Sequence, residues 1–164
     1  MSEILGLLVI GYLVVTGASL IIKLLIPQYI FTIDEVTEYK SEVYNSVLEL
    51  IQEDLGVQIK GLTVIYDSSP NDDLRGCYQQ NDHSITLYLQ NLESVHSFTL
   101  TLVEEIHHAI FLSTRQTMKT YQAYDKKVGY ENNPLEFAAK VYARDKFKSI
   151  HRVLKKRGLI RYRV

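Results

Sequence analysis

Apolar residues recur along the chain with two different periods, and these periods predict the order of helices and strands. Residues 34–55 carry apolar side chains at helical spacing with charged residues between them, so we predict an amphipathic helix that ends at Gly56. The segment 57–66 is rich in apolar β-formers and predicts a strand. Two short runs, 77–80 and 85–89, flank a polar turn and predict a β-hairpin.

Helical spacing returns in the second half of the chain. Residues 97–113 predict a second helix with a strong apolar face. A third helix is predicted over 134–157, because Asn-Pro-Leu-Glu is a typical helix start and a glycine follows the end. The polar, tyrosine-bearing segment 114–130 has no clear period. This order predicts an α+β fold, in which a small, mostly antiparallel sheet packs against the second helix and the C-terminal helix.

The first 27 residues are a different kind of sequence. Residues 4–22 contain no charge, and a helix of that length would span about 28 Å, close to the ~30 Å hydrocarbon layer of a bilayer. We therefore predict one transmembrane anchor over 1–27, followed by a single domain over 28–164. The short leading tail contains Glu3 and no base, whereas Lys23 follows the span, which favours a single-pass protein of the cell membrane with a cytoplasmic domain. A cleaved signal peptide and a buried core helix are the alternatives.

Composition narrows the class of protein further. The 164 residues are 46% hydrophobic and 23% charged, which is typical of a globular domain and excludes a disordered chain. A net charge of −1 does not indicate nucleic-acid binding by the chain as a whole. Cys77 is the sole cysteine, so an intramolecular disulfide and a cysteine-based zinc knuckle are excluded.

Charge is unevenly distributed along the chain. Residues 140–164 carry ten Lys or Arg and one acid, which leaves eight bases and eighteen acids for the remainder. The cluster Lys155, Lys156 and Arg157 lies at the end of the predicted C-terminal helix, and in a membrane-tethered chain its simplest partner is anionic membrane lipid. RNA or DNA is the rival partner, but no nucleic-acid module or stacking motif supports it. A solvated helix face is the third interpretation.

The clearest chemical signal lies within the helix predicted over 97–113. Glu104, Glu105, His107 and His108 interrupt an otherwise apolar helix, and burying such groups is costly unless they are paired or bind a metal. Residues four apart share a helical face, so Glu104 and His108 can bind one ion. Glu105 lies one turn from His108, where its carboxylate could hold a water molecule on that ion.

These residues resemble the H-E-x-x-H helix of the zincin metallopeptidases. In this resemblance His108 corresponds to the second histidine, Glu105 to the catalytic glutamate, and Glu104 replaces the first histidine. Residues 130–143 are similar to the N-P-x-E-x-x-A helix of small gluzincin-type proteins, which makes Glu136 the third metal ligand. The resemblance implies a membrane-anchored metallopeptidase that hydrolyses peptide or protein substrates through a metal-bound water.

The substitution of the first histidine changes the chemistry that the resemblance implies. A Glu-His-Glu ligand set formally neutralises a divalent ion, which weakens its Lewis acidity and raises the pKa of its water. Carboxylate ligands also favour harder ions, so zinc, manganese and iron are all candidates. The domain is then a weakened enzyme, an enzyme with another metal, or a non-catalytic membrane-tethered binding or regulatory module without metal. The resemblance also places strand 85–89 beside the substrate cleft.

Each of these residues also has an ordinary structural interpretation. Glu136 occupies the N3 position of a capping box whose N-cap is Asn133. Glu104 and His108 could form an i,i+4 ion pair on a solvated face, and His107 is interpreted as a packing or surface histidine. Two partial motifs occur in the right order along the chain. This order favours the metal site over a chain in which all of these structural interpretations hold at once.

Overall fold

The computed structural model describes residues 33–69, 74–92 and 94–160, all of which belong to one compact unit. The predicted membrane anchor over 1–27 lies outside these residues. Among the helices that the structure describes, none has the length and apolar character needed to cross a bilayer. In chain order the elements are α2 (Ile33–Leu55), β1 (Thr63–Asp67), β2 (Gly76–Gln79), β3 (Ser84–Tyr88), η1 (Leu89–Asn91), α3 (Val95–Phe111), α4 (Arg115–Val128), η2 (Tyr130–Asn132) and α5 (Pro134–Lys156).

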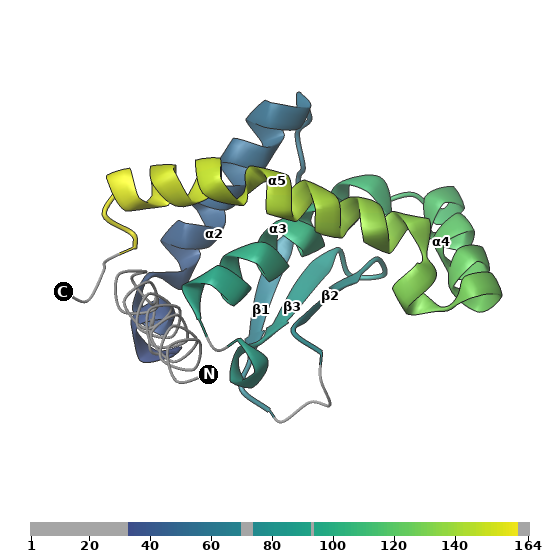
Figure 1. Ribbon diagram of the computed structural model, residues 1–164, viewed down its shortest axis with the longest axis horizontal. Coiled ribbons are helices and arrows are strands. Elements are labelled where there is room, and N and C mark those ends of the chain that lie inside the picture. The colour runs from purple at the N-terminus through teal and green to yellow at the C-terminus, as the bar shows by residue number, and fades with distance from the viewer. Residues whose placement is uncertain (1–32, 70–73, 93, 161–164) are drawn as a thin grey trace, which may run out of the picture. The chain divides into compact units, whose positions relative to one another are not determined.

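The predicted α+β class is confirmed, and α3 is the central element of the fold. Figure 1 shows the sheet on one side of α3 and α5 crossing its other side. Helix α2 packs against both α3 and α5, whereas α4 lies beside the first turns of α5. The helix that carries the candidate chemistry is therefore enclosed by elements from both halves of the chain.

The sheet is mixed, which corrects the expectation of a mostly antiparallel sheet. Its order is β1-β3-β2 among the described strands, with β1 parallel to β3 and β2 antiparallel to β3. The predicted hairpin is present, and β3 inserts between its hairpin partner and β1. Because β3 is central, its residues from Ser84 to Leu87 are all buried.

The strand predicted over 57–66 begins only at Thr63. The preceding backbone is instead bonded to the end of α2. The N–H of Val57 donates to the carbonyl oxygen of Gln52 at 3.1 Å, and the N–H of Ile59 donates to the Gln52 side chain at 2.7 Å. These groups cap the helix and are therefore not available to a sheet ladder.

The hydrophobic core forms where α3 meets the sheet and the two long helices. Phe98, Leu102 and Ile106 recur at helical spacing on α3 and are buried. The start of α3 is defined by a capping box between Ser94 and Ser97, two residues earlier than the period alone predicts. The facing core residues are Ile85 and Leu87 of β3, Val47 and Ile51 of α2, and Ile150 and Leu154 of α5.

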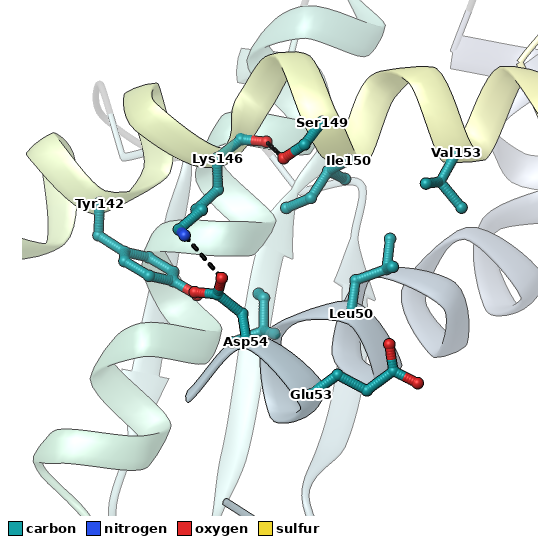
Figure 2. Close-up of a pocket in the computed structure, with 9 residues that line it drawn as sticks. Leu50, Glu53, Asp54, Tyr142, Lys146, Ser149, Ile150 and Val153 are labelled. Atoms are coloured by element: carbon teal, nitrogen blue, oxygen red, sulfur yellow. Dashed lines mark hydrogen bonds and ion pairs between the residues drawn. The ribbon is translucent and has the colours of Figure 1, made fainter. Parts of the chain in front are cut away.

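Polar contacts join α2 to α5 at the rim of this core. Lys146 Nζ lies 2.6 Å from Asp54 Oδ1, and the Tyr142 hydroxyl donates to Asp54 Oδ2 at 3.0 Å. Figure 2 shows these side chains at one end of a pocket of about 320 Å³, with the apolar side chains of Leu50 and Ile150 beside it. The hydrogen bond from Lys146 holds the pKa of Asp54 below its usual value. All three polar groups at this end are thus paired with one another.

Candidate metal and catalytic site

Three of the residues singled out in the sequence meet in space. Glu104 and His108 lie one turn apart on α3, and Glu136 lies in the first turn of α5. One ligand atom from each of the three falls within 4.8 Å of the others. Ala139 and Ala143 of α5 are almost completely buried, and such small side chains allow the two helices to approach closely.

His108 and Glu136 form the closest contact of this group. His108 Nε2 lies 3.3 Å from Glu136 Oε1, and both side chains are buried. Burial lowers the pKa of His108, but the hydrogen bond with Glu136 and the surrounding carboxylates raise it by more, so its pKa lies above the ordinary value. His108 therefore pairs with Glu136 on another helix, and not with Glu104 as the i,i+4 interpretation expects.

The environment of Glu136 is built by α4 and by the loop that follows it. The Tyr121 hydroxyl donates to Glu136 Oε1 at 2.6 Å. Burial raises the pKa of Glu136, but hydrogen bonds, first from His108 and then from Tyr121, lower it by more. The carboxylate is consequently stabilised in its ionised form inside the protein.

Glu136 does not act as a helix cap, so the capping-box interpretation is wrong. Asn133, which is fully buried, caps α5 through its Oδ1, which accepts from the N–H of Leu135 at 3.0 Å. The backbone N–H of Asn133 donates to the carbonyl oxygen of Tyr130 at 3.1 Å, and not to Glu136. The Asn133 Nδ2 donates to the carbonyl oxygen of Tyr121 at 3.2 Å, which ties α4 to the start of α5.

The second oxygen of Glu136 makes this group suitable for a cation. Oε2 is buried and accepts no hydrogen bond of regular geometry from the described residues, although Tyr130 is close enough to lower the pKa of Glu136 further. Ligand atoms at 2.0–2.2 Å from a tetrahedral ion lie about 3.4 Å apart, so the observed spread of up to 4.8 Å must narrow for all three side chains to bind one ion. An unpaired buried carboxylate oxygen beside an imidazole and a second carboxylate fits a divalent cation.

Glu105 lies next to this group but faces the sheet. Burial raises its pKa to about 7, and the charges of Glu104 and Glu136 add to the effect, while His108 and the backbone N–H of Tyr78 oppose it. A Cβ at Gly76 of β2 would lie 2.7 Å from Thr101 Cγ2 and 3.1 Å from Glu105 Cγ. Glycine at position 76 therefore allows β2 to lie directly against the face of α3 that carries Glu105.

His107 takes a structural position, as the sequence interpretation expects. Its ring lies 4.3 Å from that of Phe111 and 5.1 Å from that of Tyr142. Burial lowers its pKa to about 4, so the neutral form is favoured. It does not belong to the group of three side chains formed by Glu104, His108 and Glu136.

A cleft of about 550 Å³ opens beside these residues. Glu104 and Glu105 lie in it together with Arg75 and Gly76 at the start of β2 and Arg144 on α5. The expectation that strand 85–89 borders the cleft is wrong, because β3 is the central strand and the edge strand β2 takes that place. Insertion of β3 between β1 and β2 is a result of the mixed pairing, which the hairpin pattern alone does not reveal.

Sequence reasoning missed the residues that surround the ligands. Tyr121 and Tyr130 act on Glu136 through contacts with no fixed spacing from it. The segment 115–128 forms an amphipathic helix without any buried residue, so its polar composition concealed its period. Its N-cap Thr114, which accepts from the N–H of Thr117 at 3.1 Å, was the available signal.

The basic residues predicted to lie near a membrane differ in their environment. Lys155 and Lys156 are exposed in the last turn of α5. Arg157 Nη1 instead bonds Glu49 Oε2 at 2.6 Å and Ser46 Oγ at 3.0 Å, which ties the end of α5 to α2. Arg157 therefore has a partner within the domain.

Searches with this chain against protein-family models, curated proteins and solved structures found no significant match. Its geometry and chemistry are therefore the basis for a functional proposal.

Proposed function

We propose that this chain is a metal-dependent hydrolase of peptide bonds, with Glu104, His108 and Glu136 as metal ligands and Glu105 as the general base. The observation that carries the proposal is the convergence of three donor side chains from two helices within 4.8 Å, with Glu136 Oε2 buried and without a hydrogen bond of regular geometry from the described residues. Zinc is the first candidate, and manganese or iron is favoured by the two carboxylates.

The proposed ligands have different tasks. Glu136 is held by Tyr121 and His108, so its orientation is established before any cation arrives. Glu104 is only partly buried at the edge of the cleft, which lets it adjust its position. A divalent cation bound here would supply Lewis acidity for hydrolysis, reduced by the formal neutrality of the ligand set.

Glu105 is suited to hold and release a proton. Its raised pKa of about 7 places the two protonation states near balance at neutral pH, which is where general bases work best. Although its side chain is buried against β2, it is one of the residues that line the cleft, next to Glu104. Removal of its carboxylate is expected to affect hydrolysis far more than metal binding.

The shape of the cleft supports an extended peptide as the substrate. Strand β2 pairs only with β3 among the described strands, and Gly76 at its start lies beside the cleft, although the N–H of Tyr78 on this strand is already bonded to Glu105. Extended peptides bind such edges by adding a strand to the sheet. This arrangement would align a peptide along the cleft past Glu104 and Glu105.

A non-catalytic binding or regulatory domain is the second candidate. It is favoured by one observation, namely that Glu136 contacts both His108 and the Tyr121 hydroxyl, which makes these groups structural partners of one another. In that case the ionisable residues of α3 stabilise the contact between α3, α4 and α5. The sequence of 1–27 and the exposed Lys155 and Lys156 support a cell-membrane location next to anionic lipid in either case.

Elemental analysis of the purified full chain tests the metal site directly. We expect about one equivalent of zinc, manganese or iron, lost in His108→Ala and retained in Glu105→Gln. Peptide hydrolysis should disappear in both variants, because the first lacks a ligand and the second lacks the base. Metal-free wild-type protein after reconstitution, or undiminished hydrolysis in Glu105→Gln, would exclude the proposed enzyme and leave the binding domain.

A further inference from the structure

Two arginines line the cleft beside the candidate metal site. Arg75 precedes β2 and Arg144 lies on α5, and both side chains are exposed at the cleft. Neither side chain makes a hydrogen bond or an ion pair with a residue that the structure describes. Because β2 and α5 both pack on α3, the two arginines approach the cleft from different elements.

A third cation in the cleft is already engaged. Lys140 Nζ lies 3.7 Å from Glu131 Oε2 and 4.7 Å from the centre of the Tyr130 ring. These partners engage the Lys140 ammonium group, whereas the side chains of Arg75 and Arg144 make no hydrogen bond with a residue that the structure describes. A guanidinium presents donors in a planar fork that matches the two oxygens of a carboxylate, which an ammonium cannot do.

Arg144 lines the same cleft as Glu104, one of the proposed ligands. An anionic group bound by Arg144 would therefore lie near the place where a scissile bond meets the ligands. A neutral substrate would leave both guanidinium groups at the cleft without a hydrogen-bond partner among the residues that the structure describes.

We propose that the cleft selects peptides by a carboxylate group close to the reacting bond, which Arg75 and Arg144 bind. The inference rests on the proposed function in that it names the substrate class of the same site. The carboxylate can come from an acidic side chain or from the free C-terminus of a peptide. Both sources offer the same planar pair of oxygens, and the test separates them.

The test measures binding, so that it does not depend on turnover. The protein is the full chain with Glu105→Gln, loaded with zinc, and the readout is the anisotropy of three fluorescein-labelled hexapeptides. One peptide has a central glutamate and an amidated C-terminus, the second has glutamine there and is amidated, and the third has glutamine and a free C-terminus. We expect the amidated glutamine peptide to bind about tenfold more weakly than at least one of the two peptides that carry a carboxylate, as loss of a charged hydrogen bond implies.

Variants of the arginines then assign the preference to the cleft. Arg144→Gln and Arg75→Gln should each remove most of the preference and leave binding of the amidated glutamine peptide unchanged. Arg152→Gln is the matched control, because Arg152 is exposed on the same helix but does not line the cleft. Preservation of the preference in both cleft variants, or its loss in Arg152→Gln to the same extent, would overturn the assignment.

Failure of this inference is separable from failure of the proposed function. Equal binding of the three peptides overturns the carboxylate preference, even if the chain with native Glu105 hydrolyses them all. Conversely, a tenfold preference that depends on Arg144 supports the inference even where native protein shows no hydrolysis. That second result would assign the cleft to the non-catalytic binding domain.

Discussion

The hydroxyl of Tyr121 donates a hydrogen bond of 2.6 Å to Oε1 of Glu136, and so connects α4 to the centre of the candidate metal site. Glu136 Oε1 also lies 3.3 Å from His108 Nε2. Tyr121 and His108 both contact Oε1, so Oε2, which accepts no hydrogen bond of regular geometry from the described residues, is the atom of Glu136 that we propose for a cation. Tyr121 is thus a positioning residue for a proposed ligand, and not a ligand itself.

Tyr121→Phe should weaken metal binding while the fold is retained. Removal of a hydrogen bond that orients a metal ligand typically lowers metal affinity by about 10–100-fold, and we expect a loss in that range. Competition with a chromophoric chelator measures it. Tyr124→Phe on the same helix is the control, since Tyr124 is exposed and no contact with Glu136 is present. Equal affinity of Tyr121→Phe and wild type would show that Glu136 needs no orienting bond.

Gly76→Ala should destabilise the protein through a clash between β2 and α3. The new methyl would lie 2.7 Å from Thr101 Cγ2, and overpacking of this kind costs about 1–3 kcal/mol. Chemical denaturation measures the change in the free energy of unfolding. Adding Thr101→Ser removes the methyl that is hit and should restore part of the loss. If the double variant loses as much free energy of unfolding as the two single variants added together, the strain does not come from the contact with the Thr101 methyl.

His151 should make the protein less stable as the pH falls. It is buried on α5, and burial, followed by the charges of His96 and Lys155, lowers its pKa below the ordinary value of 6.5. The unfolded state therefore binds a proton at a higher pH than the folded state. The stabilising contribution is complete above about pH 6.5 and is lost as the pH falls through the folded pKa.

His151→Gln tests this prediction, because glutamine is polar but does not titrate. The free energy of unfolding of the variant should change less between pH 7.5 and pH 5 than that of wild type. The comparison uses the difference in slope, so a constant offset between the two proteins does not affect it. Parallel pH profiles would mean that His151 is protonated equally in both states.

Asp54→Asn tests an acidic group whose pKa, like that of His151, is lowered in the folded state. The contribution of Asp54 to stability should therefore also decrease as the pH falls. Lys146 lowers the pKa of Asp54, so the ion pair stabilises the folded state above the ordinary value of 3.8 and stops doing so as the pH falls through the folded pKa. Because both side chains are largely accessible to water, the effect at neutral pH should be small. Thermal unfolding should show a difference between variant and wild type at pH 7 that vanishes near pH 2.

The sequence was sufficient for features that depend on neighbouring residues. The helical period and the Asn133-Pro134 start predicted α5 to within one residue of its observed end, and the hairpin pattern located β2 and β3. The i,i+4 spacing of Glu104 and His108 placed them on one face of α3, because helical geometry is local. The choice of Glu136 came from a resemblance, since 28 residues separate it from His108.

Other features depend on the packing of elements that are distant in the chain. Strand β3 pairs in parallel with β1 and antiparallel with its hairpin partner β2, and so lies between two strands of which only one is its neighbour in the chain. The burial that raises the pKa of Glu105 depends on β2 approaching through Gly76. The position of Tyr121 depends on the bond from Asn133 that joins α4 to α5.

The amino-acid sequence by itself determined α2, α3, α5, the hairpin and the shared face of Glu104 and His108, because period, caps and turns act over a few residues. Only the tertiary structure decided that Glu136 meets His108, that Tyr121 orients it and that Arg75 and Arg144 line one cleft. These contacts form only when α4, α5 and β2 pack around α3. Packing depends on the complementary shapes of side chains such as Ala139, Ala143 and Gly76, which no spacing in the chain encodes.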